Sequence, residues 1–278
     1  MKKFRFGEYE VAYEERGTGE PLILLHNGGM DHRIWDHQIE HFSRTHRVLA
    51  IDHLGFGASD KPRRELPLSL FSVALESFIE ELGLDQVNLA GNCMGSATAL
   101  EYTLRNPRRV KRLVLCNITS RDILLAGPLR DVYLSYREDR EAREKFIAGV
   151  EEAGMTRKQT DRFLRSLYGM VPPDDVAFGD HVFALCNTPG QMRSLYVVLS
   201  NFDHYLTADA FEKPEGFPPS CVIWGKENYI LPPAAGEAFC ARLQPERADF
   251  VEAAGHLVMR EQPARVNATI ESFLKDPV

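Results

Sequence analysis

A cysteine lies between two glycines where an apolar run gives way to a helical pattern. The residues Gly91-Asn92-Cys93-Met94-Gly95 follow the strand-like QVNLA and precede a stretch with helical spacing. A nucleophile on such a strand-to-helix turn needs small flanking residues, because larger side chains would collide with neighbouring backbone. The helix N-terminus supplies unpaired N–H groups and partial positive charge, which favour a thiolate and developing negative charge. The pattern therefore predicts a nucleophilic Cys93 rather than a buried structural thiol.

The elements that would position this cysteine alternate along the chain. Short apolar runs bounded by turn residues are followed by helical patterns, which predicts a parallel sheet covered by helices. An antiparallel hairpin over residues 2–17 is expected to precede them. Strands are expected at residues 21–27, 46–52, 86–92, 110–118, 221–225 and 247–253, and helices at residues 33–44, 69–83, 94–107, 233–243 and from Pro263 onward.

This alternation is interrupted from about Arg121 to about Lys213. The interrupting segment is helical in pattern and charged, carries interleaved aromatic residues and shows no convincing strand. We therefore expect a discontinuous α/β core over residues 1–120 and 214–278, with a helical cap or lid at residues 121–213. An independent binding domain is the alternative. The segment has no self-contained apolar pattern, which favours a lid packed on the core.

Four motifs around Cys93 resemble, in order, those of the α/β-hydrolase superfamily, and the resemblance covers nearly the whole chain. They are Leu25-His26-Asn27-Gly28-Gly29 (oxyanion loop), Asp52-His53-Leu54-Gly55-Phe56-Gly57-Ala58-Ser59 (D-x-x-G-x-G-x-S loop), Trp224-Gly225-Lys226-Glu227-Asn228 (acid segment) and Ala254-Gly255-His256 with Glu261-Gln262-Pro263 (histidine segment). The order nucleophile, acid, histidine is the one that this fold uses. The resemblance implies an α/β-hydrolase fold with a mostly parallel eight-stranded sheet, flanking helices and an inserted cap.

The resemblance makes His256 the base that partners Cys93 and places Asn228 where the family carries an acid. In a serine triad an amide there costs roughly ten-thousand-fold in turnover, because it favours the wrong imidazole tautomer. A thiol can instead transfer its proton to histidine at rest, and the amide carbonyl of Asn228 would then accept from the imidazolium. Three other residues remain open as the partner of His256, namely Glu227, Glu252 and Asn117.

The resemblance also implies an oxyanion hole. Its donors would be the backbone N–H of Gly28 and that of Met94, the residue after the nucleophile. We expect His26 to hold the oxyanion loop rather than touch substrate. Residues 52–59 should shape the turn beside the site.

Composition excludes several classes of partner. The chain has 278 residues and a formal net charge of -7, which argues against a nucleic-acid partner. The five cysteines form no C-x-x-C pair, so neither a disulfide framework nor a metal site is expected. The Gly-rich LGFGASD does not open a helix as a dinucleotide loop would, and we expect no cofactor. No signal peptide or bilayer-spanning run is visible, so we expect a cytoplasmic protein without a membrane partner.

These residues predict an enzyme that acts on an ester, thioester or lactone through an acyl-cysteine, with a Cys93-His256-Asn228 triad. The partner would be a small-molecule acyl substrate, with carrier- or cofactor-linked thioesters as a special case. Hydrolysis, as in an esterase or thioesterase, and acyl transfer both remain open, because amines and thiols compete well with water for a thioester. A catalytically decayed small-molecule binding protein is the alternative. Halide displacement is disfavoured, since in this family it needs a carboxylate nucleophile.

Overall fold

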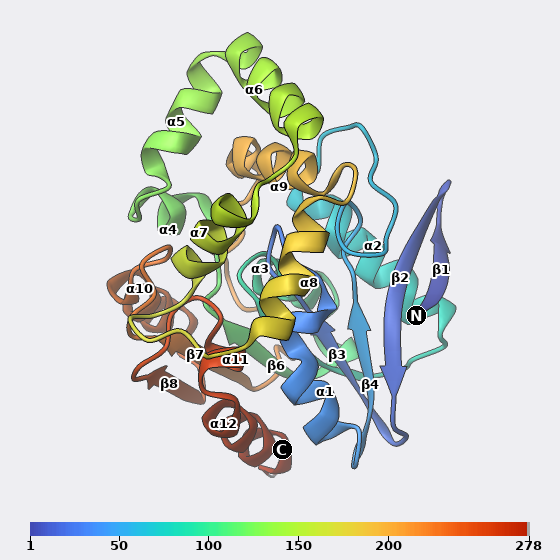
Figure 1. The fold of residues 1–278 in the computed structure, drawn as a ribbon. Helices are drawn as coiled ribbons and strands as arrows, with labels where there is room; N and C mark the ends of the chain where they lie inside the picture. Colours follow the sequence, from blue (N-terminus) through green and yellow to red (C-terminus); the bar gives the residue numbers. More distant parts are fainter. Residues whose placement is uncertain (277–278) are drawn as a thin grey trace.

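A mostly parallel sheet of eight strands forms the centre of the computed structural model, which describes residues 1–276 (Figure 1). The strand order is β1-β2-β4-β3-β5-β6-β7-β8, and β2 pairs antiparallel with both β1 and β4 while the other neighbours are parallel. This confirms the predicted fold class; residues 277 and 278 of the predicted core lie outside the described range. The strands are β1 (Lys2–Phe6), β2 (Tyr9–Arg16), β3 (Glu20–Leu25), β4 (His46–Ile51), β5 (Val87–Asn92), β6 (Val110–Cys116), β7 (Ser220–Gly225) and β8 (Arg247–Val251).

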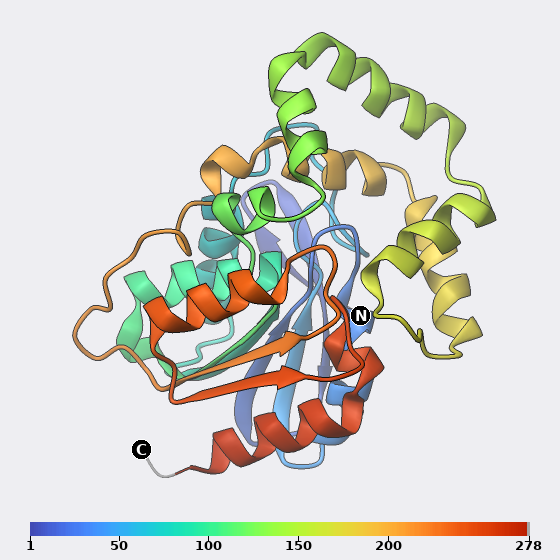
Figure 2. The same cartoon turned by 90° about the vertical axis from the view of Figure 1, so that its left-hand side faces the viewer.

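Helices on both faces explain why the central strands are apolar without alternation. All six residues of β5 and of β7 are buried, as expected for parallel strands that are covered on each side. Helices α1 (Asp36–Phe42) and α12 (Pro263–Lys275) cover one face, and α2 (Leu68–Glu81), α3 (Met94–Arg105) and α10 (Pro233–Leu243) cover the other (Figures 1 and 2). The short helix α11 (Val258–Glu261) precedes α12.

The chain between β6 and β7 consists of helices and loops and lies over one end of the sheet (Figure 2). Its helices are α4 (Arg121–Leu125), α5 (Arg130–Glu138), α6 (Arg140–Ala153), α7 (Arg157–Leu167), α8 (Val176–Cys186) and α9 (Gln191–Ser200). We refer to residues 121–213 as the cap segment. Within residues 1–276 no helix is both long and apolar enough to cross a bilayer.

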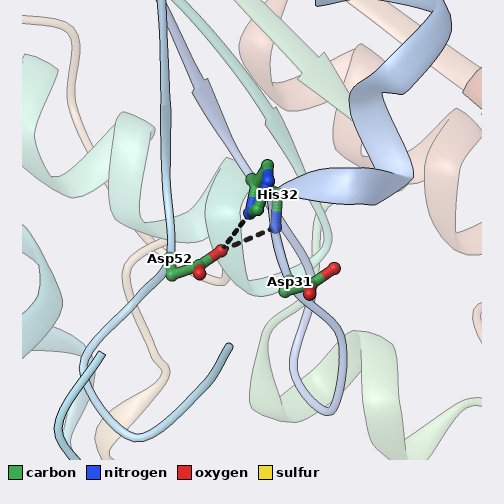
Figure 3. A group of neighbouring side chains, drawn as sticks. All are labelled: Asp31, His32 and Asp52. Atoms are coloured by element: carbon green, nitrogen blue, oxygen red, sulfur yellow. Dashed lines mark hydrogen bonds and ion pairs between the residues drawn. The ribbon is translucent and has the colours of Figure 1, made fainter. Parts of the chain in front are cut away.

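The loop of residues 52–59, which follows β4, is stabilised by an ion pair and by backbone hydrogen bonds. Oδ1 of Asp52 accepts from the backbone N–H and from Nδ1 of His32, at 2.8 and 2.7 Å (Figure 3). Its Oδ2 accepts from the backbone of Ala58 at 2.8 Å, and the hydroxyl of Ser59 donates to the Asp52 carbonyl at 2.6 Å. Burial alone would lower the pKa of His32, but the hydrogen bond and ion pair with Asp52 raise it to about 9. These contacts give residues 52–59 the structural role that the sequence predicts.

Helix α3 begins directly against the carboxyl ends of β5 and β3; Gly91 permits the first close approach and Gly95 the second. A Cβ at Gly95 would lie 2.2 Å from the carbonyl oxygen of Leu25, and one at Gly91 would lie 2.4 Å from the backbone nitrogen of Ser96. The atoms that would be struck belong to the backbone of the sheet and of the helix, which cannot move aside as a flexible side chain can. The glycine spacing in the G-x-C-x-G motif is therefore a packing requirement of this corner.

The variant Gly95→Ala should lower the free energy of unfolding by about 1–3 kcal/mol, because the added methyl group pushes α3 away from β3. Gly149→Ala is the matched control, since a Cβ at this position in α6 would meet no atom of residues 1–276 within 4 Å apart from its chain neighbours and the adjacent backbone of its own helix. That control should be neutral or more stable by at most about 1 kcal/mol. Urea denaturation followed by circular dichroism measures both variants, and equal stabilities would contradict this account of the corner.

Candidate active site

The backbone of Cys93 occupies a strained conformation at the corner between β5 and α3. Its φ is 53° and its ψ is -110°, outside the regions that non-glycine residues ordinarily adopt. Such a conformation costs about 1–3 kcal/mol and persists only where its surroundings enforce it. Here the N–H of Cys93 donates to the carbonyl of Cys116 on β6, and its carbonyl accepts from Ala97 in α3, both at 3.0 Å.

Cys93 opens onto an apolar cavity of about 350 Å³ between the core and the cap segment, a volume within the range of small-molecule sites. The core contributes Cys93, His256 and the loop that carries Gly28. The cap contributes apolar side chains, among them Leu129, Tyr136, Phe146, Phe163, Leu195 and Tyr196. The structure therefore brings the predicted nucleophile, base and oxyanion loop to one cavity.

The loop predicted to form the oxyanion hole reaches this cavity at Asn27 and Gly28, and Met94 also lines it. Within residues 1–276 the N–H of Gly28 donates to no protein group, and the N–H of Met94 lies at the Cys93 sulfur. The loop is held by His26, whose Nε2 accepts from the backbone of His53 at 2.9 Å. Nδ1 of the same ring therefore carries the proton and donates to the carbonyl of Asn27 at 2.7 Å. These contacts match the expected role of His26.

The thiol and the imidazole are both neutral near pH 7. Burial raises the pKa of the Cys93 thiol to about 12, and the N–H of Met94 and the hydroxyl of Thr119 lower it in part. Among residues 1–276 that hydroxyl has no hydrogen-bond partner of normal geometry. Burial lowers the pKa of His256 to about 4. No hydrogen bond joins the two side chains among the described residues. The expectation of a resting thiolate–imidazolium pair is therefore wrong, because burial in apolar surroundings disfavours both the thiolate and the imidazolium.

Asn228 contacts His256, but with the opposite atom from the one expected. The atom that faces Nδ1 of His256 is the amide nitrogen of Asn228, at 3.3 Å. The amide oxygen instead accepts from the backbone N–H of Leu231 at 3.0 Å, and the nitrogen also donates to Oδ1 of Asn117 at 3.1 Å. The prediction that the carbonyl accepts from His256 is wrong, because the turn after β7 already uses that oxygen.

The other three candidates for partner of the ring lie elsewhere. Glu227 accepts from the backbone of Met170 at 2.6 Å, and Glu252 pairs with Lys226. In the described part of the chain neither carboxylate hydrogen-bonds to His256. Asn117 donates to the carbonyl oxygen of His256 at 3.1 Å, so it contacts the main chain of this residue rather than its ring.

Glu261 ties the histidine loop to the cap segment, a role that the sequence did not reveal. Its carboxylate accepts from the backbone of Gly169 at 2.6 Å and from that of Gly255 at 2.8 Å. The backbone N–H of His256 also donates to the carbonyl of Leu167 at 2.8 Å. Burial raises the pKa of Glu261 to about 7, against the N–H groups that favour its charged form. The family-like E-x-P segment marked this residue without indicating what it binds.

A comparison with known protein families shows the family of this chain, and individual relatives share its fold or part of its sequence. A family profile described as alpha/beta hydrolase fold matches residues 20–263. The chain is 27% identical over 277 residues to the 2-hydroxy-6-oxo-6-(2'-aminophenyl)hexa-2,4-dienoic acid hydrolase of Metapseudomonas resinovorans, covering 96% of this chain and 88% of that one. Epoxide hydrolase 2 of Caenorhabditis elegans is 23% identical over 297 residues, covering 96% and 77%. A thermophilic esterase from Thermogutta terrifontis shares the fold with a TM-score of 0.71 at 24% identity, covering 97% and 94%.

Cys93 should react slowly with iodoacetamide at pH 7, because a thiol with a pKa of about 12 is almost entirely protonated there. The rate should keep rising with pH for as long as the protein remains folded. Mass spectrometry of the Cys93 peptide measures it without interference from Cys240, which is also partly accessible. His256→Ala should leave the rate at pH 7 nearly unchanged. A rate that is already at its plateau below pH 7 would instead show a stable thiolate.

Proposed function

This chain belongs to the α/β hydrolase fold family, and from that premise we propose that it is an enzyme that acts on an ester, thioester or lactone through an acyl-cysteine at Cys93. The observation that carries the proposal is the position of the Cys93 sulfur. It lies on the strained turn before α3 and lines an apolar cavity that Gly28 and Met94 also line; within residues 1–276 the N–H of Gly28 donates to no protein group. A substrate carbonyl bound in this cavity would place its carbon at the thiol and its oxygen at these backbone donors.

In the proposed reaction the sulfur attacks the acyl carbonyl carbon and a C–S bond forms. The oxygen becomes an oxyanion that accepts from the N–H groups of Gly28 and Met94, which stabilise this charge most in the transition state. Collapse of the tetrahedral intermediate breaks the bond to the leaving group. The thiol proton passes to the oxygen or sulfur of the leaving group. His256 can carry this proton only in the tautomer whose Nε2 is unprotonated. Water, or another nucleophile, then releases the acyl group.

The walls of the cavity favour an apolar acyl group. Tyr136, Phe146, Phe163 and Tyr196 bring aromatic surface from the cap, and the core supplies its polar groups near Cys93. Because the acyl-cysteine is itself a thioester, amines and thiols compete with water for it, so hydrolysis and transfer share the same first step. The relatives that are named hydrolases support water as the acceptor.

A second candidate function is small-molecule binding without turnover. It is favoured by the neutral thiol, by the neutral imidazole and by the amide at position 228, which together weaken the proton transfer that turnover needs. A binding protein of this kind would retain ligands in the cavity and leave Cys93 unmodified. The two functions therefore differ in the covalent state of one sulfur atom.

Incubation with a short-chain p-nitrophenyl ester should add one acyl mass to the wild-type chain, and hydroxylamine should remove it as it removes a thioester. Intact-mass spectrometry measures the adduct. Cys93→Ala should abolish it, whereas Cys240→Ala, which removes the other partly accessible thiol, should retain it. Absence of an adduct on the wild-type chain, or an adduct of equal yield on Cys93→Ala, would argue for the binding function.

A further inference from the structure

Three buried asparagines form a chain of amides behind His256. Asn92 ends β5, Asn117 follows β6 and Asn228 follows β7, and each is at most 2% exposed. The nitrogen of Asn228 donates to the oxygen of Asn117 at 3.1 Å, and the nitrogen of Asn117 donates to the oxygen of Asn92 at 3.3 Å. The orientation of each amide therefore depends on that of its neighbour.

Hydrogen bonds to backbone groups fix the orientation of all three amides. The N–H of Leu231 donates to Asn228 at 3.0 Å and the N–H of Gly225 donates to Asn117 at 3.1 Å, so the atoms that receive them must be oxygens. The carbonyl oxygen of His256 accepts from Asn117 at 3.1 Å and from Asn92 at 3.2 Å, so those atoms must be nitrogens. Backbone donors and acceptors cannot exchange roles, and neither, in consequence, can these amides.

Reversing Asn228 alone would break two contacts at once. Its nitrogen would then meet the N–H of Leu231, and its oxygen would meet the oxygen of Asn117. Reversing Asn117 as well would place its nitrogen against the N–H of Gly225. The NH₂ group of Asn228 is therefore the group presented to Nδ1 of His256.

We infer that Asn228, braced by Asn117, is a positioning residue that holds the proton of His256 on Nε2. A donor that faces Nδ1 requires the lone pair on that nitrogen, and a neutral imidazole carries one proton. Burial lowers the pKa of His256 to about 4, so the ring is neutral at pH 7. The edge of the ring on the cavity side therefore carries an N–H donor, whereas a triad base would carry an acceptor there.

This inference rests on the proposed function and deepens it. With Nε2 protonated, His256 adds a third N–H donor to those of Gly28 and Met94, and this end of the cavity suits the oxygen atoms of an acyl group. Removal of the thiol proton by His256 and activation of water both need the other tautomer, whose Nδ1–H would point at the NH₂ of Asn228. Acylation of Cys93 therefore proceeds without His256 as base. Hydrolysis of the acyl-cysteine is slowed for the same reason, so an acyl group, once attached, is retained on the sulfur.

Nitrogen NMR of the protein with ¹⁵N-labelled histidine reads the tautomer directly. The spectrum of His256→Gln identifies the His256 signals among those of the nine histidines. In the wild type at pH 7 the Nδ1 resonance should be that of an unprotonated nitrogen and the Nε2 resonance that of a protonated one. A protonated Nδ1 in the wild type would overturn the inference, whatever any variant does.

Asn228→Asp supplies the second test, because a carboxylate can only accept from Nδ1 and should move a proton to that atom. The acyl group should leave Cys93 about 10- to 10,000-fold faster in this variant than in the wild type. Intact-mass spectrometry at intervals after a pulse of p-nitrophenyl ester measures this rate. Asn228→Leu removes the donor without adding an acceptor and should leave a mixture of tautomers. Asn267→Asp in α12, whose oxygen accepts from Gln38, is the control and should change neither readout.

The two proposals fail in different ways. If no ester acylates Cys93 while the wild type still shows an unprotonated Nδ1, the acyl-cysteine function is wrong and the tautomer assignment holds. If Cys93 is acylated but Asn228→Asp folds normally by circular dichroism and releases the acyl group no faster, the positioning role of Asn228 is wrong.

Discussion

The strained backbone at Cys93 is the constraint on which the rest of the site depends. At φ 53° and ψ -110° the chain turns from β5 into α3 within one residue, so the sulfur leaves the sheet at the N-terminus of a helix. Hydrogen bonds to β6 and within α3 hold this turn, and the two flanking glycines allow α3 to lie against the ends of β5 and β3. Gly28 and Met94 line the same cavity as the sulfur. The polar end of the cavity is thus a consequence of the fold.

The histidine is positioned by elements that are distant in sequence. Its backbone N–H contacts the cap segment at Leu167, its carbonyl contacts Asn92 and Asn117, and its ring contacts Asn228. The cap contacts the loop and forms part of the cavity wall, so it contributes both to the place of the imidazole and to the burial that keeps it neutral. The protonation states of Cys93 and His256 therefore depend on the packing of the cap against the core as well as on the two residue types.

Sequence patterns were sufficient for the sheet, because buried parallel strands are apolar runs and their order of appearance limits the topology. They were also sufficient to place Cys93 at the turn between β5 and α3, since flanking glycines indicate a tight strand-to-helix turn. They were not sufficient for the charge state of the thiol, because the cap that desolvates it is a helical segment without a recognisable motif. The sequence also could not predict which way the Asn228 amide points. Its orientation depends on the N–H of Leu231 and on Asn117, which is distant in sequence and contacts Asn228 only in the folded chain.

Whether Cys93 becomes acylated is best seen in a crystal structure after soaking with a p-nitrophenyl ester of an apolar acid. Electron density for a thioester should join the Cys93 sulfur to the acyl carbon. Its carbonyl oxygen should accept from the N–H groups of Gly28 and Met94, and the acyl chain should lie under the cap. An intact ester in the cavity with an unmodified sulfur, or an acyl oxygen turned away from both N–H groups, would contradict it.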